Sequence, residues 1–142
     1  MMIKISKNEY LLGLAIIVKA ILFSVAKPVL AATSIPGGEV SGTWTLAGSP
    51  YLIDGDIIVP TGETLSIEPG VEVIFQSWYK LTVNGTLDAV GTEAEPILFT
   101  ASNKWLGIRF VNASDESQLT HVIVERGQAT GASPENKGGG IY

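Results

Sequence analysis

The chain has 142 residues, of which 46% are apolar, with 16 Gly and 7 Pro; this suffices for one domain with a modest core. It has no Cys, which excludes disulfide bonds and thiolate chemistry. Four Lys and one Glu precede Ala32, whereas 13 Asp/Glu and 5 Lys/Arg stand from Ala32 onward, a net charge of −8 (5 − 13) for that part. Because this acidic part has no Lys/Arg cluster, it would repel phosphate backbones, and we expect no nucleic-acid partner.

The first 31 residues have the order of a secretory signal peptide. Lys4 and Lys7 precede a long apolar run over 11–26, and Val29-Leu30-Ala31 supplies small residues before a cleavage site at Ala31-Ala32. Lys19 interrupts the apolar run, and a charge near the membrane centre costs a few kcal/mol, which disfavours a retained N-terminal anchor, the alternative. We therefore predict a signal peptide over 1–31 and a secreted or cell-surface protein, extracellular or periplasmic.

Short β-prone runs begin after this leader. Residues 32–41, with Pro36-Gly37-Gly38, show no periodicity and are predicted as a flexible lead-in. Between 56 and 75, three apolar runs are separated by Pro/Gly turns: Ile57 to Val59, Leu65 to Ile67 and Val71 to Phe75. Because the apolar residues recur at every second position, each run is predicted as a strand with one buried face.

The apolar pattern then returns. The separations from Ile57 to Leu81, Leu65 to Leu87, Val73 to Ile97 and Phe75 to Phe99 are 24, 22, 24 and 24 residues. A looser third cycle covers 105–124, with strands at 105–110 and 119–124, and Ile141 and Tyr142 resemble the opening of a fourth. A period of about 23 residues over three strands predicts stacked coils.

Short, evenly spaced strands would also fit an antiparallel sandwich. Two features favour parallel coils: turns follow strands of only four or five residues, and apolar positions match across three strands rather than two. The coil hypothesis places Leu65 under Leu87, Ile67 under Ala89 and Phe75 under Phe99. Each such buried side chain would contribute roughly 1.5 to 3 kcal/mol.

Several motifs carry a family resemblance, namely Gly42-Thr43-Trp44-Thr45, Ile58-Val59-Pro60-Thr61-Gly62, Leu65-Ser66-Ile67-Glu68-Pro69-Gly70-Val71, Val83-Asn84-Gly85-Thr86-Leu87 and the closing Gly138-Gly139-Gly140-Ile141-Tyr142. Over 42–142 the chain resembles the opening of bacterial secreted right-handed parallel β-helix proteins of the pectin-lyase-like superfamily. The resemblance implies an all-β solenoid of about three coils, with an N-terminal cap over 43–53 and more coils beyond Tyr142. The chain is accordingly expected to be a fragment.

Candidate residues for catalysis or metal binding are scattered. His121 is the single histidine, and its alternation with Val122 and Val124 favours a surface position over a catalytic one. Asp54-Gly55-Asp56 could offer two carboxylates to Ca²⁺, but the spacing matches no known loop, and Asp and Gly are common in turns. We predict no metal and no cofactor.

The resemblance also suggests what an enzyme of this fold would need. Lyases with this fold use clustered acidic calcium ligands beside an Arg or Lys base. The chain has residues of these types: Asp88, Lys104, Arg109, Asp115 and Glu116. No motif joins them, so no catalytic residue is assigned. Whether the whole protein is an enzyme stays open.

Aromatic residues supply the candidate binding site. Packing within the fold is favoured for Trp44 and Trp105, whereas Trp78 and Tyr79 lie at a turn and could stack on sugar rings. The leading hypothesis is a secreted or cell-surface β-helix scaffold of unspecified ligand, with polysaccharide or cell-surface components as partners. The alternatives are the N-terminal part of a polysaccharide-active or carbohydrate-binding protein, and an adhesin passenger. The sequence leaves the oligomeric state open.

Overall fold

A computed structural model describes residues 31–130 and 139–142, which form an all-β structure with one 3-10 turn. The predicted signal peptide therefore lies, except for Ala31, outside the described residues. Among the residues that are described, no helix has the length and apolar character needed to cross a membrane. The elements are β1 (Thr33–Ile35), β2 (Gly38–Glu39), β3 (Gly42–Trp44), η1 (Leu46–Gly48), β4 (Tyr51–Ile53), β5 (Ile57–Val59), β6 (Thr64–Ile67), β7 (Glu72–Phe75), β8 (Leu81–Val83), β9 (Thr86–Val90), β10 (Ile97–Ala101), β11 (Ile108–Phe110), β12 (Gln118–Thr120) and β13 (Val122–Val124).

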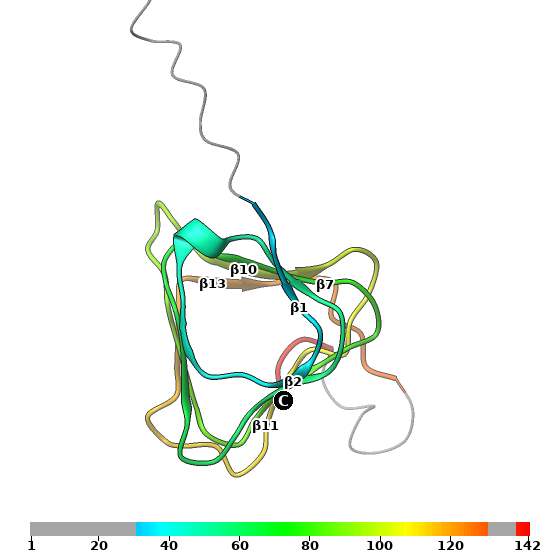
Figure 1. The fold of residues 1–142 in the computed structure, drawn as a ribbon. Helices are drawn as coiled ribbons and strands as arrows, with labels where there is room; N and C mark the ends of the chain where they lie inside the picture. The colour runs from blue at the N-terminus through cyan, green and yellow to red at the C-terminus, as the bar shows by residue number, and fades with distance from the viewer. Residues whose placement is uncertain (1–30, 131–138) are drawn as a thin grey trace, which may run out of the picture.

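The strands form three parallel sheets, each of which takes every third strand of the chain. Sheet A has the order β1-β4-β7-β10-β13, sheet B the order β11-β8-β5-β2, and sheet C the order β12-β9-β6-β3. Three consecutive strands therefore make one coil, and each coil pairs in parallel with the next. Seen from the N-terminal coil, the chain turns clockwise as it recedes (Figure 1), which is the right-handed sense usual for parallel connections. The predicted right-handed parallel β-helix is confirmed, and the antiparallel sandwich is wrong.

Inward-facing side chains of successive coils form apolar columns. Leu65 is in register with Leu87, and Ile67 with Ala89, as predicted. Ile57 likewise pairs with Leu81 in sheet B. These side chains are buried because alternate residues of a strand point to one face, and here that face lines the interior.

The predicted stacking of Phe75 under Phe99 is wrong by two residues. Phe99 is in register with Val73, and Phe75 with Ala101. The cause is the turn between β9 and β10: six positions separate Ile67 from Val73, whereas ten separate the equivalent Ala89 from Phe99. Trp105 packs against both rings, with centroid distances of 4.2 Å to Phe75 and 6.3 Å to Phe99.

The segment 32–41 differs from the expected flexible lead-in, because it contains β1 and β2. Thr33–Ile35 pairs in parallel with Tyr51–Ile53, and Gly38–Glu39 pairs with Ile57–Ile58. The corner between β1 and β2 depends on Gly37, whose φ of +105° is unfavourable for residues with a side chain. Strands of two or three residues around such a corner leave no apolar period in the sequence.

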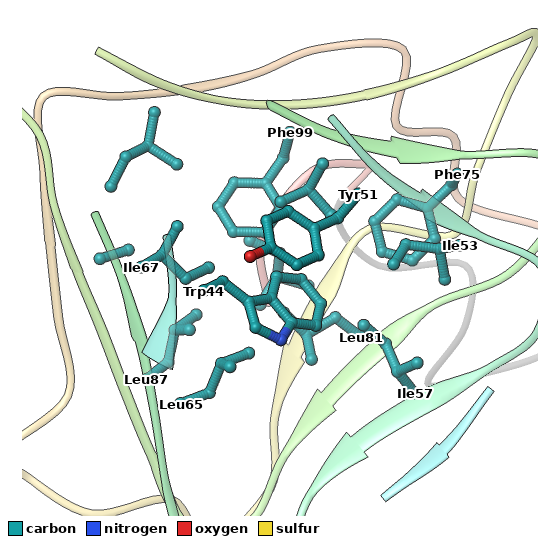
Figure 2. Packing of buried hydrophobic residues seen from close by; sticks show 14 of the residues in the cluster. Trp44, Tyr51, Ile53, Ile57, Leu65, Ile67, Phe75, Leu81, Leu87 and Phe99 are labelled. Carbon is teal, nitrogen blue, oxygen red and sulfur yellow. The ribbon is translucent and has the colours of Figure 1, made fainter. Parts of the chain in front are cut away.

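Two aromatic rings occupy the interior at the N-terminal end. Trp44 of β3 and Tyr51 of β4 stack with centroids 4.6 Å apart and ring planes within 7°. Figure 2 shows both rings in the middle of the coil, with aliphatic side chains around them. The Tyr51 hydroxyl accepts a hydrogen bond from the Thr45 N–H at 2.9 Å and donates one to the Thr45 carbonyl at 3.2 Å. This pair belongs to the segment 43–53 for which the resemblance implies a cap.

The third cycle is divided differently from the expected pattern. The strand expected over 119–124 is two strands, β12 and β13, with His121 between them at a φ of +48°. The opening of a fourth cycle is confirmed, because Ile141 forms a parallel bridge with Ile108, and the Phe110 N–H donates to the Tyr142 carbonyl at 2.8 Å.

Candidate functional site

The corner between β7 and β8 carries the predicted sugar-stacking residues. Trp78 is 45% exposed, so its ring is available to a ligand. Tyr79 is partly buried and packs against the core, and its carbonyl accepts a hydrogen bond from the Leu106 N–H of the following coil at 2.8 Å. The structure thus places the two residues side by side at a corner but gives only Trp78 an open ring.

The Asp54-Gly55-Asp56 turn lies at the equivalent corner of the preceding coil. Asp54 accepts a hydrogen bond from the Ser34 hydroxyl at 2.9 Å. Asp56 forms an ion pair with the Lys80 ammonium at 3.1 Å and also accepts from the Lys80 N–H at 3.1 Å. Each carboxylate therefore has a different protein partner, and both link one coil to its neighbour. No cluster of three or more His, Cys, Asp or Glu suited to a metal occurs among residues 31–130 and 139–142.

His121 is an exposed corner residue between sheets C and A. Its carbonyl accepts the Ile97 N–H at 3.0 Å, so its backbone helps to attach β13 to the preceding coil. The predicted surface position follows from a left-handed backbone conformation at a corner, rather than from strand alternation as the sequence suggested.

The residue types that a lyase would need are distributed over different sheets and corners. Asp88 lies on sheet C, where its carboxylate accepts from the Gln118 amide at 2.9 Å. Arg109 lies on sheet B, where its guanidinium contacts the Tyr142 hydroxyl and stands 4.8 Å from the centre of that ring. Lys104 precedes β11, and Asp115 and Glu116 follow it in the turn to β12. The fold therefore does not gather these five side chains at one place.

Trp44 and Trp105 are core residues, as their sequence context favoured. Trp105 is fully buried, and its indole N–H donates to the Glu125 carbonyl at 2.8 Å. Neither ring is available for stacking on a sugar.

One surface feature was not anticipated. Sheet A carries aliphatic side chains on its outer face as well as on its inner face, which we call the outer strip: Leu52, Ile74, Leu98 and Ile123. The available signal was that the corresponding strands are apolar at consecutive positions, whereas the strands of sheet C alternate between apolar and polar residues.

Comparisons with known proteins give one distant similarity. No family model matches the chain, and no solved structure matches it. A segment of 93 residues, 64% of this chain, is 34% identical to Protein bark beetle of Drosophila melanogaster, of which it covers 3%. The chain thus spans a very small part of that relative's length.

Proposed function

We propose that the chain is a secreted or cell-surface β-helix scaffold of the pectin-lyase-like superfamily, and that the described coils form its capped N-terminal part. The observation that carries this proposal is the continuous stack of apolar columns beneath the Trp44–Tyr51 pair. Such a stack holds the coils in fixed register, so that side chains on the outer faces form regular rows that a partner can recognise. The resemblance of residues 42–142 to secreted β-helix proteins supports the superfamily and the export.

Export is tested by producing the full chain in a secreting bacterial host and determining the N-terminal residue of the protein outside the cytoplasm. The expected mature chain begins at Ala32, because Val29 and Ala31 fit the cleavage rule. A chain that stays in the cytoplasm with its leader intact would contradict the secreted location.

The scaffold role is tested against the enzymatic alternative by incubating the chain with acidic polysaccharides, with and without Ca²⁺. A scaffold leaves the polymers intact in both conditions. Release of unsaturated oligosaccharides would replace the scaffold proposal by that of a polysaccharide lyase. The adhesin alternative differs in predicting that the exported chain binds intact host cells.

A second candidate function is carbohydrate binding at the β7–β8 corner, favoured by the 45% exposure of Trp78. A flat indole can stack on the apolar face of a sugar ring. Trp78→Ala would then abolish retention of the protein on an immobilised polysaccharide, whereas the control Leu46→Ala, at another residue that is 41% exposed, would leave retention unchanged. Equal retention of the two variants would remove this candidate.

A further inference from the structure

The three sheets present different chemistry on their outer faces. In sheet C the row in register across the coils is polar, formed by Thr43, Ser66, Asp88 and Gln118. In sheet B the row passes from Ile58 through Thr82 to Arg109. Sheet A alone continues an aliphatic surface from coil to coil, the outer strip.

The outer strip is oblique because of the two-residue shift between β7 and β10. Leu52 is in register with Ile74, and Leu98 with Ile123. Ile74 is opposite Thr100, and Leu98 is opposite Glu72, so Ile74 and Leu98 are diagonal neighbours within reach of one another. The four side chains thus cross four strands as one oblique band. Three of them are partly buried, and Ile123 is 47% exposed.

The band has acidic neighbours. Glu72 is exposed beside Leu98 in register. Glu125 is exposed at the end of β13 and accepts a hydrogen bond from the Thr100 hydroxyl at 2.7 Å. Asp54 is exposed at the end of β4. Arg126 is the nearby base, 3.8 Å from the Glu125 carboxylate, and it also donates to the carbonyls of the preceding coil at 3.1 and 3.3 Å.

We propose that this face of sheet A binds a basic peptide segment that carries aliphatic side chains. The aliphatic band supplies area for burial, and the surrounding carboxylates supply attraction and orientation for Lys or Arg. A second copy of the chain fits this surface poorly. The part from Ala32 onward has a net charge of −8 (5 − 13), so two copies would bring like charges together. An anionic lipid surface is disfavoured for the same reason.

This inference rests on the proposed scaffold function and names the partner of one face. Its test uses the full chain and a labelled synthetic peptide of alternating Lys and Leu, with binding followed by fluorescence anisotropy. The matched probes are a Lys/Ser peptide, which keeps the charge, and a Glu/Leu peptide, which keeps the aliphatic side chains. Only the Lys/Leu peptide is expected to bind well, and equal binding of the Lys/Ser peptide would overturn the proposal.

Variants locate the binding face. The double variant Ile74→Thr and Leu98→Thr should weaken the Lys/Leu peptide at least about tenfold, whereas Ile58→Thr on the outer face of sheet B should not. Threonine is β-branched and suits a strand, so the substitutions remove apolar surface without introducing a residue that strands disfavour. Should the double variant fail to fold, Ile123→Thr at the most open position of the band should show the same loss to a smaller degree.

The remaining outcomes also decide whether a basic peptide occupies the outer strip. Unchanged affinity in the folded variants would overturn the proposal, as would adsorption to phosphatidylglycerol vesicles at concentrations where the peptide does not bind. Self-association of the free chain in sedimentation, lost in the same variants, would identify a second copy as the occupant. Each of these failures would leave the N-terminal cleavage and polysaccharide results of the scaffold tests unaffected, so the two proposals fail separately.

Discussion

At the scale of single residues, Gly85 shows how closely neighbouring coils approach at a corner. A Cβ atom at this position would lie 2.2 Å from the Pro60 carbonyl oxygen and 2.3 Å from that of Glu63, both in the backbone of the preceding coil. The Gly85 N–H donates to the Val59 carbonyl at 3.1 Å, which holds the corner in place. The corner at Asn84-Gly85 therefore needs glycine for lack of space.

We expect Gly85→Ala to lower the free energy of unfolding by about 2 kcal/mol or more, because backbone oxygens must move to admit the methyl group. Urea unfolding followed by circular dichroism measures the change. Gly140→Ala is the control, since within the part of the chain that the structure describes a Cβ there would meet only the Val124 Cγ1 atom, at 3.5 Å. Equal unfolding midpoints for the two variants would contradict the steric account.

Leu87 tests the apolar columns. It is fully buried in β9 and in register with Leu65. Leu87→Ala should cost about 2 to 5 kcal/mol of unfolding free energy, since it removes buried methyl groups and leaves a cavity. Val90→Ala lies in the same strand but at a residue 39% exposed, so its cost should stay within about 0.5 kcal/mol. If both variants unfold alike in urea, Leu87 is not a column residue.

At the scale of elements, the Trp44–Tyr51 pair joins β3 to β4 at the end of the solenoid. The rings stack at 4.6 Å, and the Tyr51 hydroxyl satisfies both backbone groups of Thr45. Closing this end matters because an open β-helix coil would expose apolar side chains to water and to other chains.

We expect the two rings to be energetically coupled. In a double-mutant cycle, Trp44→Ala and Tyr51→Ala should together cost about 0.5 to 1.5 kcal/mol less than the sum of the single losses, because either change removes the stacking. Thermal unfolding of the four proteins supplies the values. Trp44→Ala combined with Val90→Ala, at a residue on the outside of β9, is the additive control. Additivity in both cycles would mean that the stacked geometry contributes nothing beyond area.

The elements also show what the sequence can and cannot predict. Alternation identified β5, β6 and β8, because each has apolar residues at every second position between turn signals. It missed β1 and β2, whose two or three residues pair only through coils formed later in the chain. It misplaced Phe75 relative to Phe99 because the corner at 91–96 is longer than its counterpart in the preceding coil, and this length leaves no mark on the apolar pattern.

At the scale of the whole molecule, burial decreases toward the last coil. Inward-facing residues of β8 and β9 are fully buried, whereas Leu119, Val122 and Val124 of β12 and β13 are only partly buried. Sheet A ends at β13 in the described residues. Local stability should therefore vary along the axis.

Hydrogen exchange should reveal this gradient. Strands β8 and β9 are paired on both sides, so their amides should exchange at least about tenfold more slowly than those of β13, which within the described residues is paired on one side only. Mass spectrometry of peptides from exchanged protein measures both regions in one sample. Protection of β13 equal to that of β9 would show that the solenoid opens only as a whole.

The predictability of function differs from that of fold. The coil repeat follows from local alternation and could be predicted, but the neighbours of a surface residue depend on register. Trp78 could be recognised as an exposed turn residue. The engagement of Asp54 and Asp56 by Ser34 and Lys80, from two other coils, was not predicted, because it depends on the register of polar residues at the corners, which the apolar period does not fix. The outer strip remained hidden for the same reason.

The longer turn at 91–96, between β9 and β10, has a consequence for how this protein can evolve. It adds four residues between Ala89 and Phe99 relative to the preceding coil, while the pairing of β10 with β7 on one side and with β13 on the other stays continuous. Peptides of differing length can therefore be spliced in at such a corner without altering the rise of the spiral. New recognition loops could arise there by insertion, while the packing of the hydrophobic interior stays the same.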